Sequence, residues 1–260
     1  MRIVFFGLGS IGNRHLRLLE KVKKADIFAF KREKTEETGI KSLYSWGEVE
    51  GAKIDVAFIT NPTEYHIKTA WQCAIRDIPF FLEKPISHNC DGLATLLKEV
   101  EKRGLVTYVA YPMRFHKTIW NLRNGSIRPS NRLVVCRSNA KKWPSKRGLN
   151  SVMFELSHEI DYASYIWGDI VEIGGTLGVM DTWANLDLTH EDGNHTGAFL
   201  DMASPFEERT VAGHSILVGD NIYSRQLRYF FDNLSNNRMM NNLVDASRLF
   251  EKIVHFQEGK

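Results

Sequence analysis

The first 110 residues alternate between short apolar runs and segments in which apolar side chains recur at helical spacing. Continuous apolar runs are typical of strands buried on both faces of a sheet, and a period of about 3.6 residues is typical of helices packed against one. The pattern predicts helices after the first strand, at 65–76 and at about 91–102, and strands at 2–6, 26–30, 54–59, 79–82 and 106–111. Such alternation predicts a parallel sheet with right-handed crossovers.

The pattern changes in the second half of the chain. Helices are expected at 115–122 and 151–167, with a strand beginning at 133–137 between them. Alternating, turn-rich sequence then predicts a hairpin turn at Asp192-Gly193-Asn194 and antiparallel strands at 171–180, 183–190, 197–202 and 210–218. Helices are expected again at 223–231 and 242–246.

The junction between the first strand and the first helix carries Gly7, Gly9 and Gly12, with Ser10 and Ile11 between the last two. In a dinucleotide-binding unit the first glycine allows a sharp turn, the second lets the backbone approach a pyrophosphate, and the third brings helix and strand together. The N-terminus of the helix supplies N–H donors and partial positive charge. A glycine loop that serves only as a turn is the alternative. The preceding strand and following helix favour the dinucleotide site.

The length of 260 residues exceeds the usual size of one domain. We therefore expect an α/β protein with a Rossmann dinucleotide-binding domain at residues 1–116. Residues 117–260 should form a smaller α+β domain with an open, mainly antiparallel sheet. An open sheet face needs to be covered, so we expect a homodimer or homotetramer built on that sheet.

The end of the second predicted strand bears on the choice of dinucleotide. NAD-selective sites usually place an acidic residue there, which binds the ribose 2′-hydroxyl. This chain has Lys31 and Arg32 instead, and their charge favours the 2′-phosphate of NADP. A basic strand end in water is the alternative. The loop Thr60-Asn61-Pro62, at the carboxyl end of the third predicted strand, should also face the cofactor.

Composition and charge exclude several classes of protein. Hydrophobic residues make up 43% of the chain, yet no window of about 18 uncharged apolar residues could span a membrane. No export signal precedes the first strand, so a cytoplasmic location is expected. The net charge of +3 is too small to indicate nucleic-acid binding, and the three scattered cysteines fit reduced thiols. No metal site is expected, because His190 and His195 flank the predicted hairpin without a cysteine or aspartate cluster.

Four motifs occur in order along the chain. They are the glycine loop followed by Arg14-His15, the Asn61-Pro62 loop, Glu83-Lys84-Pro85 at a strand end, and Ala110-Tyr111-Pro112-Met113-Arg114-Phe115. Together they resemble the glucose-fructose oxidoreductase, inositol dehydrogenase and MocA family. The resemblance implies NADP or NAD as cofactor and a hydride transfer on a sugar or sugar derivative.

The same resemblance assigns roles to single residues. Lys84 is implied to be catalytic, beside the nicotinamide and the substrate, and the lysyl-proline bond is commonly cis in such relatives. A lysine in this place suits proton exchange with a substrate hydroxyl. His66, Glu83 and Arg114 are expected to contact the cofactor as well.

The predicted helix at 151–167 carries a second set of candidates. Relatives place a histidine and a nearby aspartate of this helix at the substrate, and His158 and Asp161 match that His-x-x-Asp pattern. Helical spacing puts Glu155, His158 and Tyr162 on one face, where the carboxylate can tune the histidine. We therefore expect Glu155, His158 and Asp161 to be catalytic, and His158 and Tyr162 to contact the substrate.

The sequence departs from the family pattern at the start of this helix. Many relatives have a glycine pair before the helix and an aspartate four residues before the histidine, whereas this chain has Ser151-Val152 and Phe154, with Glu155 one place later. The departure motivates a different function, a cofactor-binding sensor or partner protein without turnover. A lyase or glycosidase that uses the nicotinamide transiently is a further alternative within the family.

A strongly basic run, Lys141-Lys142-Trp143-Pro144-Ser145-Lys146-Arg147, precedes this helix. We expect Trp143, Lys146 and Arg147 to bind an anionic, phosphorylated or nucleotide-linked sugar, by charge pairing and ring stacking. A solvated loop is the alternative. A nucleic-acid site would need more interleaved aromatic residues than Trp143 alone.

Overall fold

The structure is a computed structural model that describes residues 1–31, 33, 39–125, 131–138 and 151–259. The chain divides into two compact units: Met1–Ala110 with Tyr223–Ser247, and Tyr111–Ile222 with Arg248–Lys260. The expected division after residue 116 differs from this, because Tyr223–Ser247 groups with the N-terminal residues.

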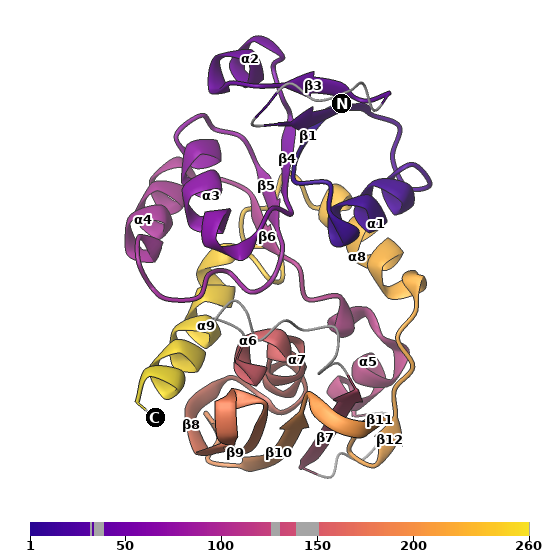
Figure 1. The fold of residues 1–260 in the computed structure, drawn as a ribbon, viewed down its shortest axis with the longest axis vertical. Coiled ribbons are helices and arrows are strands. Elements are labelled where there is room, and N and C mark those ends of the chain that lie inside the picture. Colours follow the sequence, from indigo (N-terminus) through magenta and orange to yellow (C-terminus); the bar gives the residue numbers. More distant parts are fainter. Residues whose placement is uncertain (32, 34–38, 126–130, 139–150, 260) are drawn as a thin grey trace. The chain divides into compact units, whose positions relative to one another are not determined.

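The first unit is built on a six-stranded parallel sheet (Figure 1). Its order is β3-β2-β1-β4-β5-β6, the order of a dinucleotide-binding Rossmann sheet. The strands are β1 (Arg2–Phe6), β2 (Asp26–Phe30), β3 (Lys41–Leu43), β4 (Val56–Ile59), β5 (Phe80–Leu82) and β6 (Thr107–Val109). All but β3 lie within the predicted ranges, and the predicted parallel sheet is confirmed.

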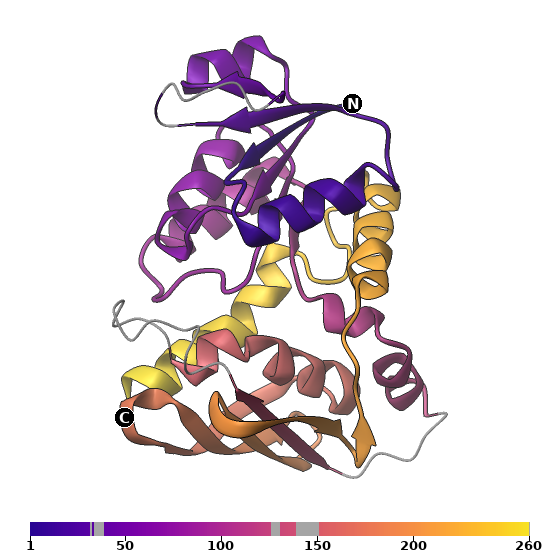
Figure 2. The same ribbon diagram turned by 45° about the vertical axis from the view of Figure 1, so that its right-hand side comes forward.

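Helices cover both faces of this sheet (Figures 1 and 2). One face carries α3 (His66–Ala74), which follows the short η1 (Thr63–Tyr65), and α4 (Leu93–Arg103). The other carries α1 (Ser10–Leu19) and the part of α8 (Asp220–Asp232) that belongs to this unit. The short α2 (Trp46–Gly51) follows β3.

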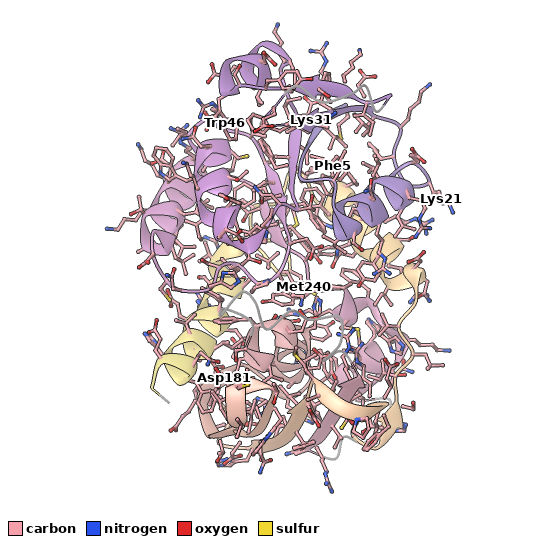
Figure 3. All side chains as sticks on the ribbon, viewed as in Figure 1. Phe5, Lys21, Lys31, Trp46, Asp181 and Met240 are labelled. Atoms are coloured by element: carbon pink, nitrogen blue, oxygen red, sulfur yellow. The ribbon has the colours of Figure 1, made fainter. Side chains whose placement is uncertain are left out.

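A stack of aromatic rings forms the core under α1 and α8. The rings of Phe5 and Phe81 lie 4.7 Å and 4.8 Å from that of Phe58, each nearly parallel to it. Phe230 of α8 packs on Phe81 with ring centroids 5.4 Å apart. Phe5 is labelled among the side chains in Figure 3. Fully burying a ring of this size contributes about 1.5–3 kcal/mol, so the Phe230 contact holds α8 on the sheet.

The second unit contains a mixed six-stranded sheet in the order β12-β11-β7-β10-β9-β8. Its strands are β7 (Arg132–Ser138), β8 (Ile170–Leu177), β9 (Trp183–His190), β10 (His195–Asp201), β11 (Ala203–Val211) and β12 (His214–Ser215). Among the described strand pairings, β7–β10 is parallel and the others are antiparallel, so the expected mainly antiparallel sheet is confirmed. The expected strand at 210–218 is wrong, because the chain turns at Ala212 and Gly213 and residues before 210 belong to β11.

The helices of the second unit pack against one another and against this sheet (Figure 2). They are η2 (Pro112–Phe115), α5 (Lys117–Arg123), α6 (Val152–Glu155), α7 (Ser157–Trp167) and the second part of α9 (Leu243–Glu258), with η4 (Val179–Asp181) between strands. The single helix expected at 151–167 is interrupted at Leu156. Within the described ranges, no helix has the length and apolar character needed to cross a membrane.

Candidate functional site

The glycine loop of the first unit has the geometry expected of a phosphate-binding turn. Gly7 has φ 103, and a Cβ atom there would lie 2.6 Å from the backbone of Asn61. A Cβ at Gly12 would overlap the carbonyl oxygen of Gly7, because helix and strand lie close together there. Among the described residues, nothing lies within 4 Å of a Cβ built at Gly9. Two glycines are thus required by packing, and the third leaves its side open for a ligand.

The N-terminus of α1 is exposed beside this opening. Gly9 is the N-cap residue and provides no side-chain cap, and Ser10 is exposed. The first turn contains no acidic residue. Backbone N–H groups and the positive end of the helix dipole therefore face solvent, which fits a bound pyrophosphate. The predicted contact residues Gly9, Ser10 and Ile11 all lie in this turn.

The loop Thr60-Asn61-Pro62, at the carboxyl end of β4, supports the glycine loop. The Thr60 hydroxyl donates to the carbonyl of Gly7, and the Asn61 side-chain amide donates to Thr69 Oγ1 at 2.9 Å. Asn61 Oδ1 is buried without a hydrogen-bond partner among the described residues. Pro62 is exposed. Thr60 therefore holds the loop, and the Asn61 side-chain oxygen is an acceptor that the described residues leave unused.

His66 joins the two loops that follow β4 and β5. Its ring is buried, with Nδ1 2.9 Å from the carbonyl oxygen of Pro85 and Nε2 2.9 Å from that of Asn61. Burial lowers the pKa of His66 below its ordinary value, and the two carbonyl contacts oppose the change. His66 thus positions loop backbone on both sides of the predicted cofactor site.

Glu83-Lys84-Pro85 occupies the carboxyl end of β5. The Lys84–Pro85 bond is cis, as the family resemblance implied. Glu83 is buried, and its Oε1 lies 2.5 Å from Nε2 of His15 in α1. Its Oε2 accepts from the backbone N–H of Lys84 at 3.3 Å. The Glu83 carboxylate is therefore engaged with protein groups, whereas Lys84 is half-buried at the strand end.

Lys31 follows the carboxyl end of β2, and its backbone N–H donates to the carbonyl of Leu43 at 2.9 Å. Figure 3 labels it together with Trp46 at the start of α2. Arg32 lies outside the described residues. So do Lys141, Lys142, Trp143, Lys146 and Arg147, the predicted substrate loop.

In the second unit, Arg114, which was expected to contact the cofactor, forms an ion pair with Asp161, which was expected to be catalytic. The guanidinium of Arg114 donates twice to the carboxylate of Asp161, at 2.9 Å and 2.7 Å, and its Cζ lies 4.9 Å from the ring centroid of Tyr165. Burial raises the pKa of Asp161, and the Arg114 charge opposes this. Paired in this way, Asp161 anchors η2 to α7 and is poorly suited to exchange protons itself.

The helix expected to carry Glu155, His158 and Tyr162 on one face is interrupted at Leu156, between the first two. Glu155 lies 3.6 Å from a guanidinium nitrogen of Arg137 in β7. The ring of His158 meets that of Tyr111 edge-on, with centroids 5.8 Å apart. Tyr162 is fully buried, and burial followed by repulsion from a neighbouring carboxylate raises its pKa well above the ordinary value.

The histidines near the β9–β10 hairpin are accounted for by local bonds. His190 is buried between the carbonyl of Gly168 and the hydroxyl of Thr196, at 2.7 Å and 2.8 Å, and His195 is exposed beside Asp187. Across the described parts of the chain, no group of three or more His, Cys, Asp or Glu side chains is placed to hold a metal ion.

Comparison with known proteins identifies the first unit. Residues 1–111 match the sequence model of Gfo/Idh/MocA proteins, an oxidoreductase family with an NAD-binding Rossmann fold. The N-terminal part of the chain is therefore similar to this family. A curated member, myo-inositol 2-dehydrogenase of Thermotoga maritima, is 26% identical over 188 residues, which are 66% of this chain and 56% of that enzyme. The match thus spans little more than half of the relative's length.

Solved structures of Gfo/Idh/MocA type share the fold of both units. A myo-inositol dehydrogenase from Corynebacterium glutamicum has a TM-score of 0.80 at 17% identity, covering 99% of this chain and 96% of the other. The WlbA dehydrogenase of Thermus thermophilus, crystallised with NAD and UDP-GlcNAcA, has a TM-score of 0.79 at 15% identity, covering 99% and 94%. At this identity the likeness establishes the fold.

Two site features bear on the family comparison. Phe154, the residue at which the chain departs from the pattern that the resemblance implied, is buried with its ring 6.3 Å from that of Phe250. The neighbouring carboxylate, Glu155, lies 3.6 Å from Arg137. Conversely, sequence reasoning assigned no role to His15, which contacts Glu83. The sequence pattern could have revealed this residue. His15 lies three and four positions before Leu18 and Leu19, which places a polar side chain on the buried apolar face of α1.

Proposed function

We propose that this protein is an NAD(P)-dependent oxidoreductase that acts on a hydroxyl or carbonyl carbon of a sugar or sugar derivative. One observation above all supports this proposal. The first unit combines an open turn at Gly9, at the N-terminus of α1, with Lys84 at the end of β5. A family match over these residues supports it, as do relatives named for inositol and sugar-nucleotide substrates.

The residues that would hold the cofactor follow from the loop geometry. Backbone N–H groups at Gly9, Ser10 and Ile11 would bind the pyrophosphate. The buried Oδ1 of Asn61 offers an acceptor beside the glycine loop. When bound, the nicotinamide accepts or supplies the hydride. Lys31 and Arg32 would favour NADP over NAD by pairing with a 2′-phosphate, although the related WlbA dehydrogenase was crystallised with NAD.

Proton handling is assigned to Lys84 and to His158. An ammonium group can give a proton to a forming alkoxide and take it back in the reverse direction. His158 supplies a second titratable group in the unit that the family pattern assigns to the substrate. Arg114 and Asp161 serve as an anchoring pair for the helix that carries His158.

The substrate class and the assembly state rest on sequence and surface features. The basic run around Trp143 favours an anionic or nucleotide-linked sugar, with Lys146 and Arg147 as the pairing groups. The exposed side of the second sheet carries Phe199, whose ring lies 6.4 Å from that of Trp183. A homodimer or homotetramer that covers this side would remove apolar area from water.

A second candidate function is a cofactor-binding protein without turnover. It is favoured by the apolar packing of Phe154 at the position where many relatives carry a carboxylate. A family lyase or glycosidase that uses the nicotinamide transiently would instead show turnover without net change in cofactor.

The deciding experiment combines a fluorescence titration of NADH and NADPH with turnover on neutral, carboxylated and nucleotide-linked sugars. Lys84→Met should lower turnover by about 10²-fold or more while cofactor affinity stays within a few-fold. Lys68→Met, on the exposed side of α3, is the matched control and should behave as wild type. Tight cofactor binding with no turnover on any sugar would favour the sensor, and near-normal turnover of Lys84→Met would reject the mechanism.

A further inference from the structure

His15 is a polar residue in an apolar environment. Its side chain is fully buried, with ring centroids 5.0 Å from Phe81, 6.1 Å from Phe58 and 6.1 Å from Tyr223. Nδ1 has no hydrogen-bond partner among the described residues. Burying an imidazole in this way costs free energy, so the one polar contact that it makes needs a reason.

That contact is with the carboxylate of Glu83, which lies almost as deep. Only 9% of the Glu83 side chain is exposed, and its Oε1 is 2.5 Å from Nε2 of His15. The second oxygen accepts the backbone N–H of Lys84. A buried carboxylate needs donors on its oxygens, and His15 supplies the donor that does not come from the strand-end backbone.

The pair therefore links two segments that are 68 residues apart. His15 lies in the helix that begins at the glycine loop, and Glu83 is the residue directly before Lys84. If the His15 donor is removed, the Glu83 carboxylate loses its partner on Oε1 and must move toward another donor or water. Such a movement alters its bond to the Lys84 backbone and hence the position of the Lys84 side chain.

We infer that His15 is a positioning residue, which acts through Glu83 to fix Lys84 relative to the glycine loop. The inference rests on the proposed function for its meaning in catalysis, but the structural coupling can be measured without turnover. Because its side chain is fully buried, His15 would act through Glu83 and not by direct contact with a bound ligand.

Two substitutions separate positioning from simple packing. His15→Leu keeps the bulk but removes the donor, whereas His15→Gln keeps an N–H donor at about the same distance from Cα. A displacement of about 1 Å at a reacting group can cost about 10²-fold in rate, so His15→Leu should lower kcat by that order with the KM for cofactor within a few-fold. His15→Gln should recover most of kcat. His190→Leu, which removes another buried and hydrogen-bonded histidine, is the control and should lower thermal stability without selectively lowering kcat.

A spectroscopic measurement tests the coupling directly. Lysines are reductively methylated with 13C-formaldehyde, and the Lys84 resonance is identified by its loss in Lys84→Met. His15→Leu and Glu83→Gln should both displace this resonance, while His15→Gln and His190→Leu should leave it in place. A folded His15→Leu protein with an unchanged Lys84 resonance overturns the inference. A displaced resonance in a protein whose wild type turns over no substrate would uphold the inference and reject the proposed function.

Discussion

Gly9 and Gly12 lie three residues apart, yet alanine at each position should have opposite consequences. A Cβ at Gly9 meets no described atom within 4 Å, and the backbone there is extended with φ -73. Gly9→Ala should therefore leave the unliganded protein intact, and should stabilise it by about 0.4–1 kcal/mol through loss of entropy in the unfolded chain.

The same methyl group would stand where the cofactor pyrophosphate approaches Gly9. Losing one hydrogen bond to a charged group costs about 1.5–3 kcal/mol, which corresponds to a roughly 10- to 150-fold rise in Kd for NADH and NADPH. Gly9→Ala should therefore weaken cofactor binding without lowering the stability of the unliganded protein. Gly51→Ala, in α2 with open space around its Cβ, is the matched control and should bind both cofactors normally.

A Cβ at Gly12 would instead overlap the carbonyl of Gly7 and lie 2.9 Å from Oγ1 of Thr60. Overpacking costs about 1–3 kcal/mol, and alanine regains about 1 kcal/mol of helix propensity. Because the obstructing atoms are backbone, we expect a net loss near 2 kcal/mol, or about 4–8 °C in Tm. Thermal unfolding without cofactor and fluorescence titration with it measure the two effects. If Gly9→Ala binds the dinucleotide as tightly as wild type, the loop does not carry the cofactor and the reasoning fails.

Three further predictions follow from other residues. The unmodified protein should bind NADPH more tightly than NADH, and replacing Lys31 and Arg32 with acidic residues should reverse this preference. Equal affinities of the unmodified protein for NADPH and NADH would contradict the prediction. Arg114→Ala should destabilise by about 3–5 kcal/mol in urea unfolding, because it leaves the buried Asp161 carboxylate unpaired, and Arg114→Ala with Asp161→Asn should recover part of the loss. Burial holds the folded-state pKa of His66 below its ordinary 6.5, so the unfolded chain takes up the proton first as the pH falls. The free energy of unfolding should be level above about pH 6.5 and should decline below it. If the free energy of unfolding of His66→Gln declines by the same amount, another group causes the decline.

Much of the first unit could be predicted from sequence because its strands are buried on both faces. The run Ile3 to Phe6 is apolar throughout and fully buried in the middle of the sheet. The strand β3, by contrast, has three residues, of which only Leu43 is buried, and such a segment has no detectable period. The edge strand and the helix after it were accordingly not anticipated.

Predictions about side-chain partners were less successful than predictions about elements. The interruption at Leu156 leaves the apolar spacing of residues 151–167 nearly unchanged, so periodicity could not reveal it. Partners such as Arg137 for Glu155 and Arg114 for Asp161 are set by tertiary packing across tens of residues. The sequence showed which side chains could do chemistry, but it could not show which of them were already engaged.

The return of Tyr223–Ser247 to the first unit has a consequence for how the protein is made. During synthesis the ribosome releases the whole Rossmann sheet, through β6, more than 100 residues before Phe230. Until then the stacked rings of Phe58 and Phe81 lack the Phe230 ring that packs on them in the finished protein. The nascent sheet must therefore persist with part of its aromatic core uncovered until α8, which is translated after the second sheet, completes the first unit.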